Sequence, residues 1–403
     1  MSESFSKTNS IALNSLKSSS DYLMEVYSID IADNISEASH VITFRTGEPL
    51  PDPGDWDLRR APFVDYTAWP TPQIAEYSSA SGVDAYFLGF LVAKPGGDKQ
   101  IYWGGQSVMV DSNIPDESFS GNATISDYGK KDIRLFRNMG GEVILSFGGA
   151  SNVPVEEEET DITKIVALYS AIIKNYGIRH IDFDFEGAFI HNQEAQDRHV
   201  AAMAQLLQQF FYVQISYTLP VDGAPGSLEG FNEGGVNLLK KLADNGIQPS
   251  LINGMLMEFG QSSSPDAFQC CVSGLNGMHK QIASVFTDWS SNKIWRRMGA
   301  CPMFGRHLNG KIFTLDDQYK LAAFASEKNL GCLSGWDATR DRNQGFLQGC
   351  NNLQGQDLAK CTYVSQQPYE FARIISTYQP VSFTSQSVNF QSVNLMTSTK
   401  SVK

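Results

Sequence analysis

The sequence predicts a (β/α)8 TIM barrel, an α/β fold built as a single catalytic domain with an extension before it and a tail after it. The chain has 403 residues, and a barrel of this kind takes about 250 residues. Short apolar segments recur from residue 59 onward, and several of the stretches between them have the spacing of amphipathic helices. A doubly wound open sheet is the alternative, but no Gly-rich phosphate loop follows any of the expected strands.

Eight strands are expected, each of them short and apolar. They cover residues 62–68, 85–92, 142–147, 180–186, 212–219, 251–257, 297–304 and 331–337. Apolar residues recur every three or four positions over 162–176, 195–210, 235–243 and 315–326, which predicts helices there. Strands that alternate with helices in this way form parallel sheets, and eight of them close into a barrel.

Three regions follow from this pattern. Residues 1–58 are rich in Ser, Asn and acids and are expected to form a partly ordered extension, with one strand over 41–44 and an extended Pro-rich linker over 48–54. Residues 59–376 form the barrel. Residues 377–403 are a Ser/Thr-rich tail without helical spacing. Docking to a protein partner is the one function left open for the extension.

The segment from His180 to Gly187 alternates acidic and apolar residues strictly. Successive side chains of a strand point to opposite faces, so Asp182, Asp184 and Glu186 are expected on one face. Like charges this close raise each other's pKa, so at least one of the three should hold a proton near neutral pH. A protonated acid beside an ionised one is what glycosidic bond cleavage needs. In a barrel, catalytic residues lie at the C-terminal ends of strands, where Glu186 would stand.

Two other interpretations of the acidic segment stay open at this point. It could be a solvated edge strand, and the pattern Asp-x-Asp also suits a hard divalent cation. No spacing of Cys and His resembles a zinc site, and neither a metal nor a cofactor is expected. The run of four glutamates at 156–159 is interpreted as the solvated start of a helix, because acids are favourable there.

Composition restricts the partners. The chain is 42% hydrophobic and its formal net charge is −13, which argues against nucleic acid or an anionic membrane as the main partner. No stretch reaches the length of a membrane span. Residues 1–7 lack a basic start followed by an apolar run, so no signal peptide is expected. The protein is expected to be cytoplasmic at synthesis or to leave by a non-classical route. Free thiols are then the default, although Cys350 and Cys361 could close the polar loop between them.

Several expected strands end in distinctive residues. The third ends in the stretch from Ser146 to Gly149, where Gly148 and Gly149 are adjacent, and adjacent glycines allow close approach of a neighbouring backbone or ligand. They are also common in simple tight turns. The eighth ends near Trp336, whose ring could stack on a sugar or could equally belong to the core. Trp69 and Trp103 could likewise extend the cleft or belong to the core.

Taken together, these motifs resemble the family 18 glycoside hydrolases, the chitinase family. The resemblance rests on Ser146-x-Gly148-Gly149, on Asp182-x-Asp184-x-Glu186 and on Trp336, and it covers roughly residues 60–375. It is closest to a bacterial branch of the family. The supporting stretches there are 61–65 on the first strand, 216–221 on the fifth, and Asn253-x-Met255-x-Met257 on the sixth.

The resemblance implies a role for each acid. Glu186 is the expected proton donor, Asp184 is expected to orient and stabilise the N-acetyl group of the substrate, and Asp182 is expected to tune Asp184. The acetamide oxygen of the sugar then attacks the anomeric carbon, so the protein supplies no nucleophile. The residues expected to bind the substrate are Ser146, Gly148, Gly149, Tyr217, Met257, Glu258 and Trp336.

The sequence also departs from the family pattern. Arg179 and His180 replace an Asp-Gly pair at the beginning of the acidic strand, where a structural effect alone is expected. Glu258 replaces an Asp, and its longer side chain is expected to reach further into the site. His307 is expected to be a satisfied surface histidine, with a hydrogen bond to a sugar hydroxyl as the other option.

The expected activity is hydrolysis of β-1,4 linkages between N-acetylglucosamine units, in chitin or its oligosaccharides. Two alternatives remain: a protein that binds chitin or its oligosaccharides without cleaving them, and an endo-β-N-acetylglucosaminidase that acts on N-glycans. Retention of all three acids favours catalysis, because loss of the proton donor is the usual way in which activity disappears.

Overall fold

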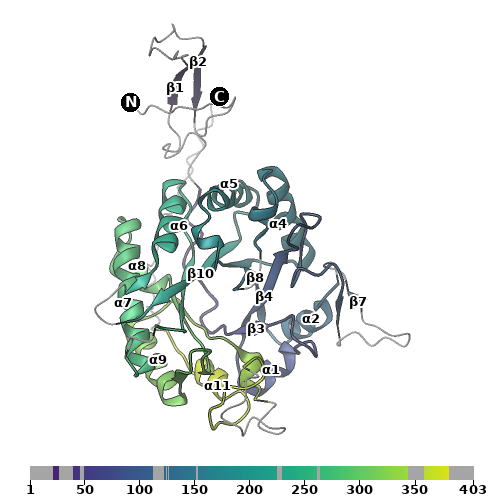
Figure 1. Ribbon diagram of the computed structural model, residues 1–403, viewed down its shortest axis with the longest axis vertical. Coiled ribbons are helices and arrows are strands. Elements are labelled where there is room, and N and C mark those ends of the chain that lie inside the picture. The colour runs from purple at the N-terminus through teal and green to yellow at the C-terminus, as the bar shows by residue number, and fades with distance from the viewer. Residues whose placement is uncertain are drawn as a thin grey trace, which may run out of the picture.

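Parallel strands form a closed ring at the centre of the molecule. The computed structural model describes residues 21–26, 40–45, 50–111, 122–123, 125, 127–150, 153–224, 229–260, 264–343 and 358–380. Within these residues the central strands lie in the order β16-β13-β12-β10-β9-β8-β4-β3. Each neighbouring pair along this order is parallel. Hydrogen bonds from Ala61 N to Leu333 O (3.2 Å) and from Phe63 N to Gly335 O (2.9 Å) close the ring (Figure 1). The predicted (β/α)8 barrel is therefore confirmed.

Every barrel strand overlaps a segment expected from the sequence. The strands are β3 (Phe63–Asp65), β4 (Ala85–Ala93), β8 (Glu142–Gly148), β9 (His180–Asp184), β10 (Gln214–Asp222), β12 (Leu251–Leu256), β13 (Met298–Pro302) and β16 (Cys332–Leu333). The boundaries differ by a few residues, and the largest consequence is at β9. That strand ends at Asp184, so Glu186 lies two residues beyond the strand instead of being its last residue.

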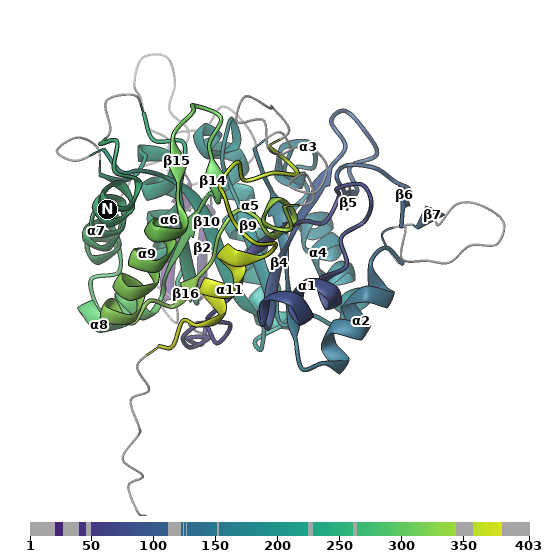
Figure 2. The same ribbon diagram turned by 90° about the horizontal axis from the view of Figure 1, so that it is seen from below.

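Shorter strands decorate the barrel or lie apart from it. The expected strand at 41–44 is part of β2 (His40–Arg45), which pairs antiparallel with β1 (Asp21–Val26), a strand that the sequence did not predict. The remaining strands are β5 (Ile101–Trp103), β6 (Met109–Val110), β7 (Asn122–Ala123), β11 (Gly230–Phe231), β14 (Gly305–Arg306) and β15 (Ile312–Phe313). In the view of Figure 2, β5, β14 and β15 lie at one end of the barrel.

Helices surround the ring (Figure 1). They are α1 (Ile74–Ser81), α2 (Lys130–Asn138), α3 (Val155–Glu158), α4 (Ile162–Tyr176), η1 (Phe189–His191), α5 (Gln193–Gln209), α6 (Glu233–Asp244), α7 (Ala267–Val285), α8 (Ser291–Arg296), α9 (Leu315–Lys328), α10 (Ala338–Asp341) and α11 (Glu370–Ser376). All four predicted helices are present as α4, α5, α6 and α9. The beginning of α4 is set by Asp161, whose carboxylate accepts from Thr163 N at 2.9 Å, and its end by Gly177 in the left-handed conformation.

The longest helix in the described part of the chain, α7, was missed because its sequence contains glycines that are poor helix formers. Packing explains one of them. A Cβ atom at Gly277 would lie 2.3 Å from the backbone carbonyl of Glu229, so the close approach of these two segments requires glycine there. Tertiary contact thus overrides local propensity in this helix.

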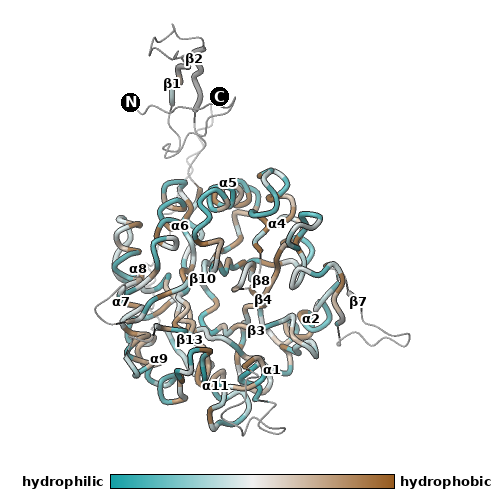
Figure 3. The backbone as a smooth tube through the Cα atoms, in the orientation of Figure 1, coloured by the Kyte–Doolittle hydropathy of each residue, from teal (hydrophilic) through white to brown (hydrophobic). Residues whose placement is uncertain are grey.

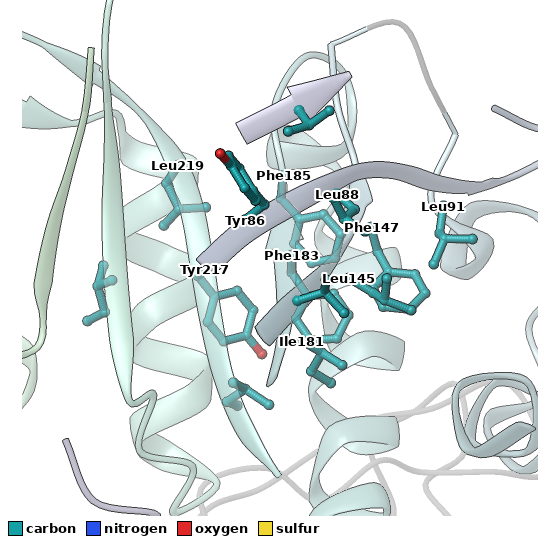
Figure 4. Packing of buried hydrophobic residues seen from close by; sticks show 14 of the residues in the cluster. Tyr86, Leu88, Leu91, Leu145, Phe147, Ile181, Phe183, Phe185, Tyr217 and Leu219 are labelled. Atoms are coloured by element: carbon teal, nitrogen blue, oxygen red, sulfur yellow. The ribbon is translucent and has the colours of Figure 1, made fainter. Parts of the chain in front are cut away.

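Two apolar layers lie on opposite faces of the strands. The larger fills the space between strands and helices and includes Ile181, Phe183 and Tyr217, as Figure 4 shows. The smaller fills the inside of the barrel and includes Phe63 and Phe87. Figure 3 shows hydrophobic residues along the central strands and hydrophilic residues over much of the surrounding helices. Because side chains alternate along β9, Asp182 and Asp184 point to the other face, into the barrel.

The segment 50–58, expected to belong to the extension, packs against the barrel. Trp56 is completely buried, and its ring stacks on Phe87 with centroids 6.1 Å apart. Asp55 Oδ2 accepts from Arg296 Nε at 2.7 Å, and Asp55 Oδ1 pairs with Arg297 Nε at 3.1 Å. The predicted boundary at residue 59 therefore cuts through a packed segment. The Pro-rich composition was misleading because the acids and the tryptophan within it make the contacts.

The described cysteines differ in state. Cys270, Cys271, Cys301 and Cys332 are buried free thiols, whereas Cys361 is disulfide-bonded. Cys350 lies outside the described residues.

At the C-terminal side, the structure is described to residue 380, and Tyr378 is buried with its hydroxyl donating to Leu330 O at 2.5 Å. No helix in the described parts of the chain is long and apolar enough to cross a membrane.

Candidate active site

Three acids follow one another at the C-terminal end of β9, on the face that points into the barrel. Asp182 and Asp184 are buried, and Glu186 is partly exposed. Their apolar neighbours Ile181, Phe183 and Phe185 are completely buried in the layer beneath the helices. The alternation of the sequence therefore places the acids together and gives Glu186 access to solvent.

Asp182 is held by three hydroxyl groups from two flanking strands. Its Oδ2 accepts from Ser146 Oγ of β8 at 2.7 Å. Its Oδ1 accepts from Ser216 Oγ at 2.6 Å and from Thr218 Oγ1 at 2.9 Å, both of β10. Burial raises the pKa of Asp182 to about 6, and the three hydroxyl groups oppose that rise. Both oxygens act as acceptors, so the hydroxyl groups favour the ionised form of Asp182 and oppose the effect of burial.

Asp184 and Glu186 share a hydrogen bond and favour protons. Burial raises the pKa of Asp184 well above its usual value, and the nearby charges of Glu186 and Asp182 raise it further. Burial also raises the pKa of Glu186. Asp184 Oδ1 is buried and has no hydrogen-bond partner among the described groups. The pKa is thus raised in all three acids, but three hydroxyl donors oppose the rise at Asp182, whereas neighbouring charges add to it at Asp184.

The Ser-x-Gly-Gly motif at the end of β8 is buried and lies against β9, the strand that carries the acids. Ser146 is completely buried, and its hydroxyl donates to Asp182 Oδ2. A Cβ atom at Gly148 would lie 2.1 Å from Asp184 O, and Gly149 N donates to that same oxygen at 2.9 Å. These residues were predicted to bind substrate. The structure instead places Ser146 and Gly148 against β9, where they position the acids.

Tyr217 lies on the wrong face of the barrel for a sugar contact. It is completely buried and packs against Phe183 with ring centroids 5.4 Å apart. Its hydroxyl bonds to His199 Nε2 at 2.9 Å, and His199 Nδ1 bonds to Glu156 Oε1 at 2.8 Å. The prediction that Tyr217 lines the substrate site is therefore wrong, because in parallel register it stands beside Phe183, not beside an acid.

The same network corrects the interpretation of the glutamate run. Glu156 is completely buried in α3 and also accepts from the hydroxyl of Tyr169 at 2.7 Å. The run is therefore not simply a solvated helix start. A sequence pattern of four identical acids gave no signal that one of them is buried among α4, α5 and β10.

Trp336 and Met257 remain candidates for substrate contact. Both are partly buried and pack on the apolar cluster inside the barrel. The ring of Trp336 stacks on Phe90 with centroids 5.5 Å apart and an interplanar angle of 15°. Phe90 is itself partly exposed and was not singled out by the sequence. Its aromatic face and that of Trp336 form an apolar surface inside the barrel.

Glu258 does not reach into the site. Its carboxylate accepts from Leu308 N at 2.6 Å and from Asn309 N at 3.1 Å, so it holds the turn between β14 and β15. His307 is buried, with Nδ1 accepting from Glu258 N and Nε2 bonding to Met303 O at 3.1 Å. His307 is thus satisfied as expected, but it is not at the surface. The prediction of Glu258 as a substrate contact is corrected, because loop contacts of this kind leave no periodic signal.

Trp69 and Trp103, which the sequence left open between cleft and core, differ from each other. Trp103 is almost completely buried, and its Nε1 donates to the hydroxyl of Tyr176 at 2.8 Å, so it belongs to the core. Trp69 is 65% exposed and follows β3 in the chain.

His180, one of the departures from the family pattern, lies at the opposite end of β9 from the acids and bonds to Asp57 Oδ1 at 2.7 Å.

Sequence reasoning missed the hydroxyl donors Ser216 and Thr218 and the buried Asn253, whose Nδ2 donates to Thr218 Oγ1 at 3.2 Å. It also assigned no role to Asp65 or Asp337. Asp337 Oδ2 accepts from Asp65 N at 3.1 Å, and burial raises the pKa of Asp337 to about 6. In β10, the alternation of polar residues with Tyr217 could have revealed the two hydroxyl donors. Among the described residues, no group of His, Cys, Asp and Glu is arranged to hold a metal ion.

Two curated proteins have sequences similar to that of this chain. No protein-family model matches the chain. It is 26% identical over 331 residues to the "Probable bifunctional chitinase/lysozyme" of Escherichia coli (strain K12), covering 79% of this chain and 34% of that protein. It is also 26% identical over 294 residues to "Endochitinase 11" of Metarhizium anisopliae, covering 70% of this chain and 52% of that protein. The chain thus spans about a third to a half of the curated relatives that it matches.

Solved structures share the fold. The catalytic domain of a hyperthermophilic chitinase from Pyrococcus furiosus superimposes with a TM-score of 0.66 at 20% identity, covering 81% of this chain and 97% of that one. A family GH18 chitinase from Chromobacterium violaceum gives a TM-score of 0.50 at 14% identity, covering 91% of this chain and 99% of that one. At these identities the likeness shows the fold. The sequence relatives and the shared barrel together confirm the resemblance of this chain to the family 18 glycoside hydrolases, the chitinase family.

Proposed function

We propose that the protein is a chitinase-like glycosidase that cleaves β-1,4 linkages between N-acetylglucosamine units with retention of configuration. The observation that carries this proposal is the hydrogen-bonded pair of Asp184 and Glu186, both with raised pKa values, above an Asp182 that accepts from three hydroxyl groups. An acid that keeps its proton near neutral pH is what protonation of a glycosidic oxygen requires.

The proposed reaction uses the three acids in different protonation states. Glu186 gives its proton to the leaving glycosidic oxygen while the acetamide oxygen of the substrate attacks the anomeric carbon. The carboxylate left on Glu186 is stabilised by the hydrogen bond with Asp184. The anion of Asp182 offsets the positive charge that develops on the acetamide-derived ring. In the second step, water attacks the anomeric carbon and returns a proton to Glu186.

Asp184 has an oxygen available for the substrate. Its buried Oδ1 has no partner among the described groups, and a buried acceptor without a partner is costly. In the proposed complex this oxygen accepts the N–H of the acetamide group, which orients the acetamide oxygen toward the anomeric carbon. The partly exposed Trp336 and Phe90 offer an aromatic surface for the apolar face of the sugar.

The relatives support the substrate class. Two of the curated proteins with similar sequences are named as chitinases, and structures of one domain with this fold, from Pyrococcus furiosus, contain chito-oligosaccharides. We therefore propose chitin or N-acetylglucosamine oligosaccharides as the ligand of this chain.

The test is hydrolysis of a fluorogenic chitobioside by the full chain. We expect Glu186→Gln to lower kcat by 10²-fold or more, because the glutamine has no proton to give. Glu327→Gln is the matched control, since Glu327 is exposed and pairs only with Lys328 among the described residues. Turnover that is equal in Glu186→Gln and the parent chain would remove Glu186 from the mechanism.

Two further assays separate the alternatives. A binding protein without activity would retain chito-oligosaccharides in a binding assay while neither the parent nor the variant releases product. An endo-β-N-acetylglucosaminidase would release glycans from an N-glycosylated protein and leave chito-oligosaccharides uncut.

A further inference from the structure

A hydrogen-bond chain runs from β12 to the acids and ends on Asp182. Asn253 Nδ2 donates to Thr218 Oγ1 at 3.2 Å, and Thr218 Oγ1 lies 2.9 Å from Asp182 Oδ1. Asn253 and Thr218 stand side by side in the parallel register of β12 and β10. All three residues are buried, so no bulk water competes for these groups.

The direction of this chain is fixed by the chemistry of its members. A threonine hydroxyl has one proton to donate. Because its oxygen already accepts from the Asn253 amide, that proton is directed to Asp182 Oδ1. With the amide reversed, Oδ1 of Asn253 would take the hydroxyl proton, and Asp182 would lose a donor. The orientation of the Asn253 amide therefore decides whether the Thr218 hydroxyl donates to Asp182 and stabilises its ionised form.

The room for Asn253 comes from the next strand. Gly299 of β13 is its register neighbour, and a Cβ atom there would lie 2.5 Å from Asn253 Oδ1. Glycine at this position leaves room for Asn253 Oδ1 beside β13 while the amide nitrogen donates to Thr218. The arrangement thus depends on four adjacent strands, from β9 to β13 in the barrel order.

We propose that Asn253 and Thr218 are positioning residues that hold Asp182 as the ionised member of the three acids by directing a hydroxyl proton onto its Oδ1. The proposal rests on the proposed function, in which Asp184 and Glu186 carry protons while Asp182 carries the charge. Neither residue touches the substrate, and each acts through Asp182.

Other titratable groups interact with Asp182 from the elements around it. They are Asp184 of β9, Tyr217 of β10, Cys301 of β13 and Cys332 of β16, with Glu186 acting through Asp184. Burial raises the pKa of Tyr217 and of both thiols, so these three groups stay neutral. The titration near Asp182 therefore belongs to the acids alone.

The first test compares Thr218→Val, which keeps the branched shape and removes the hydroxyl, with Thr218→Ser, which keeps the hydroxyl. A hydrogen bond to a charged group has an effect that corresponds to about one pKa unit. We expect the acidic limb of the kcat/KM profile on a fluorogenic chitobioside to move up by about one pH unit in Thr218→Val. Thr218→Ser should restore the parent profile.

A second readout does not depend on turnover. Carbon-13 titration of the Asp182 carboxyl group, identified with Asp182→Asn, should show the same upward shift in Thr218→Val. Thr362→Val is the matched control, since Thr362 is also buried and its hydroxyl bonds to Gln366 instead of to an acid. An unshifted Asp182 titration in Thr218→Val would overturn the proposal even in a parent chain that lacks activity.

Asn253→Ala tests the start of the chain and serves if Thr218→Val does not fold. The hydroxyl of Thr218 then loses the donor that fixes its direction but still reaches Asp182. We expect a shift in the same direction and about half as large. An unchanged pH profile and an unchanged Asp182 titration in Asn253→Ala would show that the amide has no positioning role.

Discussion

At the scale of single residues, the candidate site separates chemistry by environment. Three carboxyl groups stand at alternate positions of one segment, yet their partners differ. Asp182 is surrounded by hydroxyl donors, Asp184 has an oxygen without a partner among the described groups, and Glu186 alone has access to solvent. Neighbouring acids whose surroundings push their pKa values apart are the pattern from which acid and base roles are assigned.

Tyr217 provides a prediction at this scale. Tyr217→Phe removes the partner of His199 Nε2 in the buried network with Glu156. We expect a loss of about 1–3 kcal/mol in the free energy of unfolding, because a buried polar group is left unsatisfied. The KM for chito-oligosaccharides should not change, since Tyr217 faces the helices. Denaturant unfolding and steady-state kinetics measure the two quantities.

Trp336→Ala is the contrasting variant. It removes an aromatic face inside the barrel that is partly exposed, and we expect KM to rise several-fold. A higher KM in Tyr217→Phe together with an unchanged KM in Trp336→Ala would reverse the assignment of these two faces.

The sequence was informative for residues whose role follows from alternation. The acids on β9 were placed on one face because polar and apolar residues alternate there, and the structure confirms that face. Tyr217 was misassigned because its place in a motif outweighed its parity with Phe183, its register neighbour. Glu258 was misassigned because its partners, the backbone groups of the turn between β14 and β15, lie about 50 residues away and leave no local pattern.

At the scale of elements, the site depends on the close approach of β8 and β9. Gly148 pairs with Asp184 in the parallel register, at the point where β9 ends. Its φ angle of 109° and its contact with Asp184 O leave no place for a side chain. The backbone of β8 therefore fixes the position of the acid segment from one side, and the hydroxyls of β10 fix it from the other.

Gly148→Ala tests this dependence. The added Cβ would lie 2.1 Å from Asp184 O, so β9 must shift, and a shift of about 1 Å at a catalytic group can cost 10²-fold in rate. We expect kcat to fall at least tenfold. The matched control is Gly140→Ala, because Gly140 also has a positive φ but has open space around its Cβ position.

Both glycine variants have the strain of alanine at positive φ, so their stabilities can be compared directly by thermal unfolding. Equal kcat values in the two variants would show that the approach of β8 to β9 does not position the acids. The sequence predicted the glycine pair as a feature of the site, but only the register with β9 shows which backbone it meets.

The elements themselves were predictable where a period of two or of about 3.6 runs for long enough. The helices α4, α5, α6 and α9 follow the longer period and β9 follows the shorter one, whereas the other barrel strands were predicted as short apolar segments. The helix α7 was not predicted, because its glycines serve contacts with another segment. The boundary at residue 59 was placed too late, because a proline-rich stretch can pack when its polar residues find charged partners.

At the scale of the whole molecule, buried acids determine how stability responds to pH. Burial raises the pKa of Asp132, Asp182 and Asp337 to about 6 and that of Asp341 to about 7. In the unfolded chain these groups titrate near 4. Between about pH 4 and 7 the folded protein therefore binds more protons than the unfolded chain, and its stability falls as the pH rises.

We therefore expect a higher Tm at pH 5 than at pH 8, measured by differential scanning calorimetry. Asp52 acts in the opposite sense, since its pKa is lowered to about 2 by Lys293 and Arg297, which outweigh burial, and its contribution is lost only below about pH 4. Asp341→Asn removes one titrating group and should reduce the difference in Tm. A Tm that rises from pH 5 to pH 8 would contradict the raised pKa values of these acids in the folded protein.

The packed segment 50–58 has a practical consequence for anyone who shortens this chain. A recombinant barrel that starts at Arg59 would lack Trp56 and expose the rings of Phe87 and His180 that it covers. It would also leave the guanidinium of Arg297, buried at the base of β13, without Asp52 and Asp55. Expression clones should therefore begin no later than residue 50. Poor yield from a later start would reflect the loss of these packing and ion-pair contacts, not an intrinsic instability of the barrel.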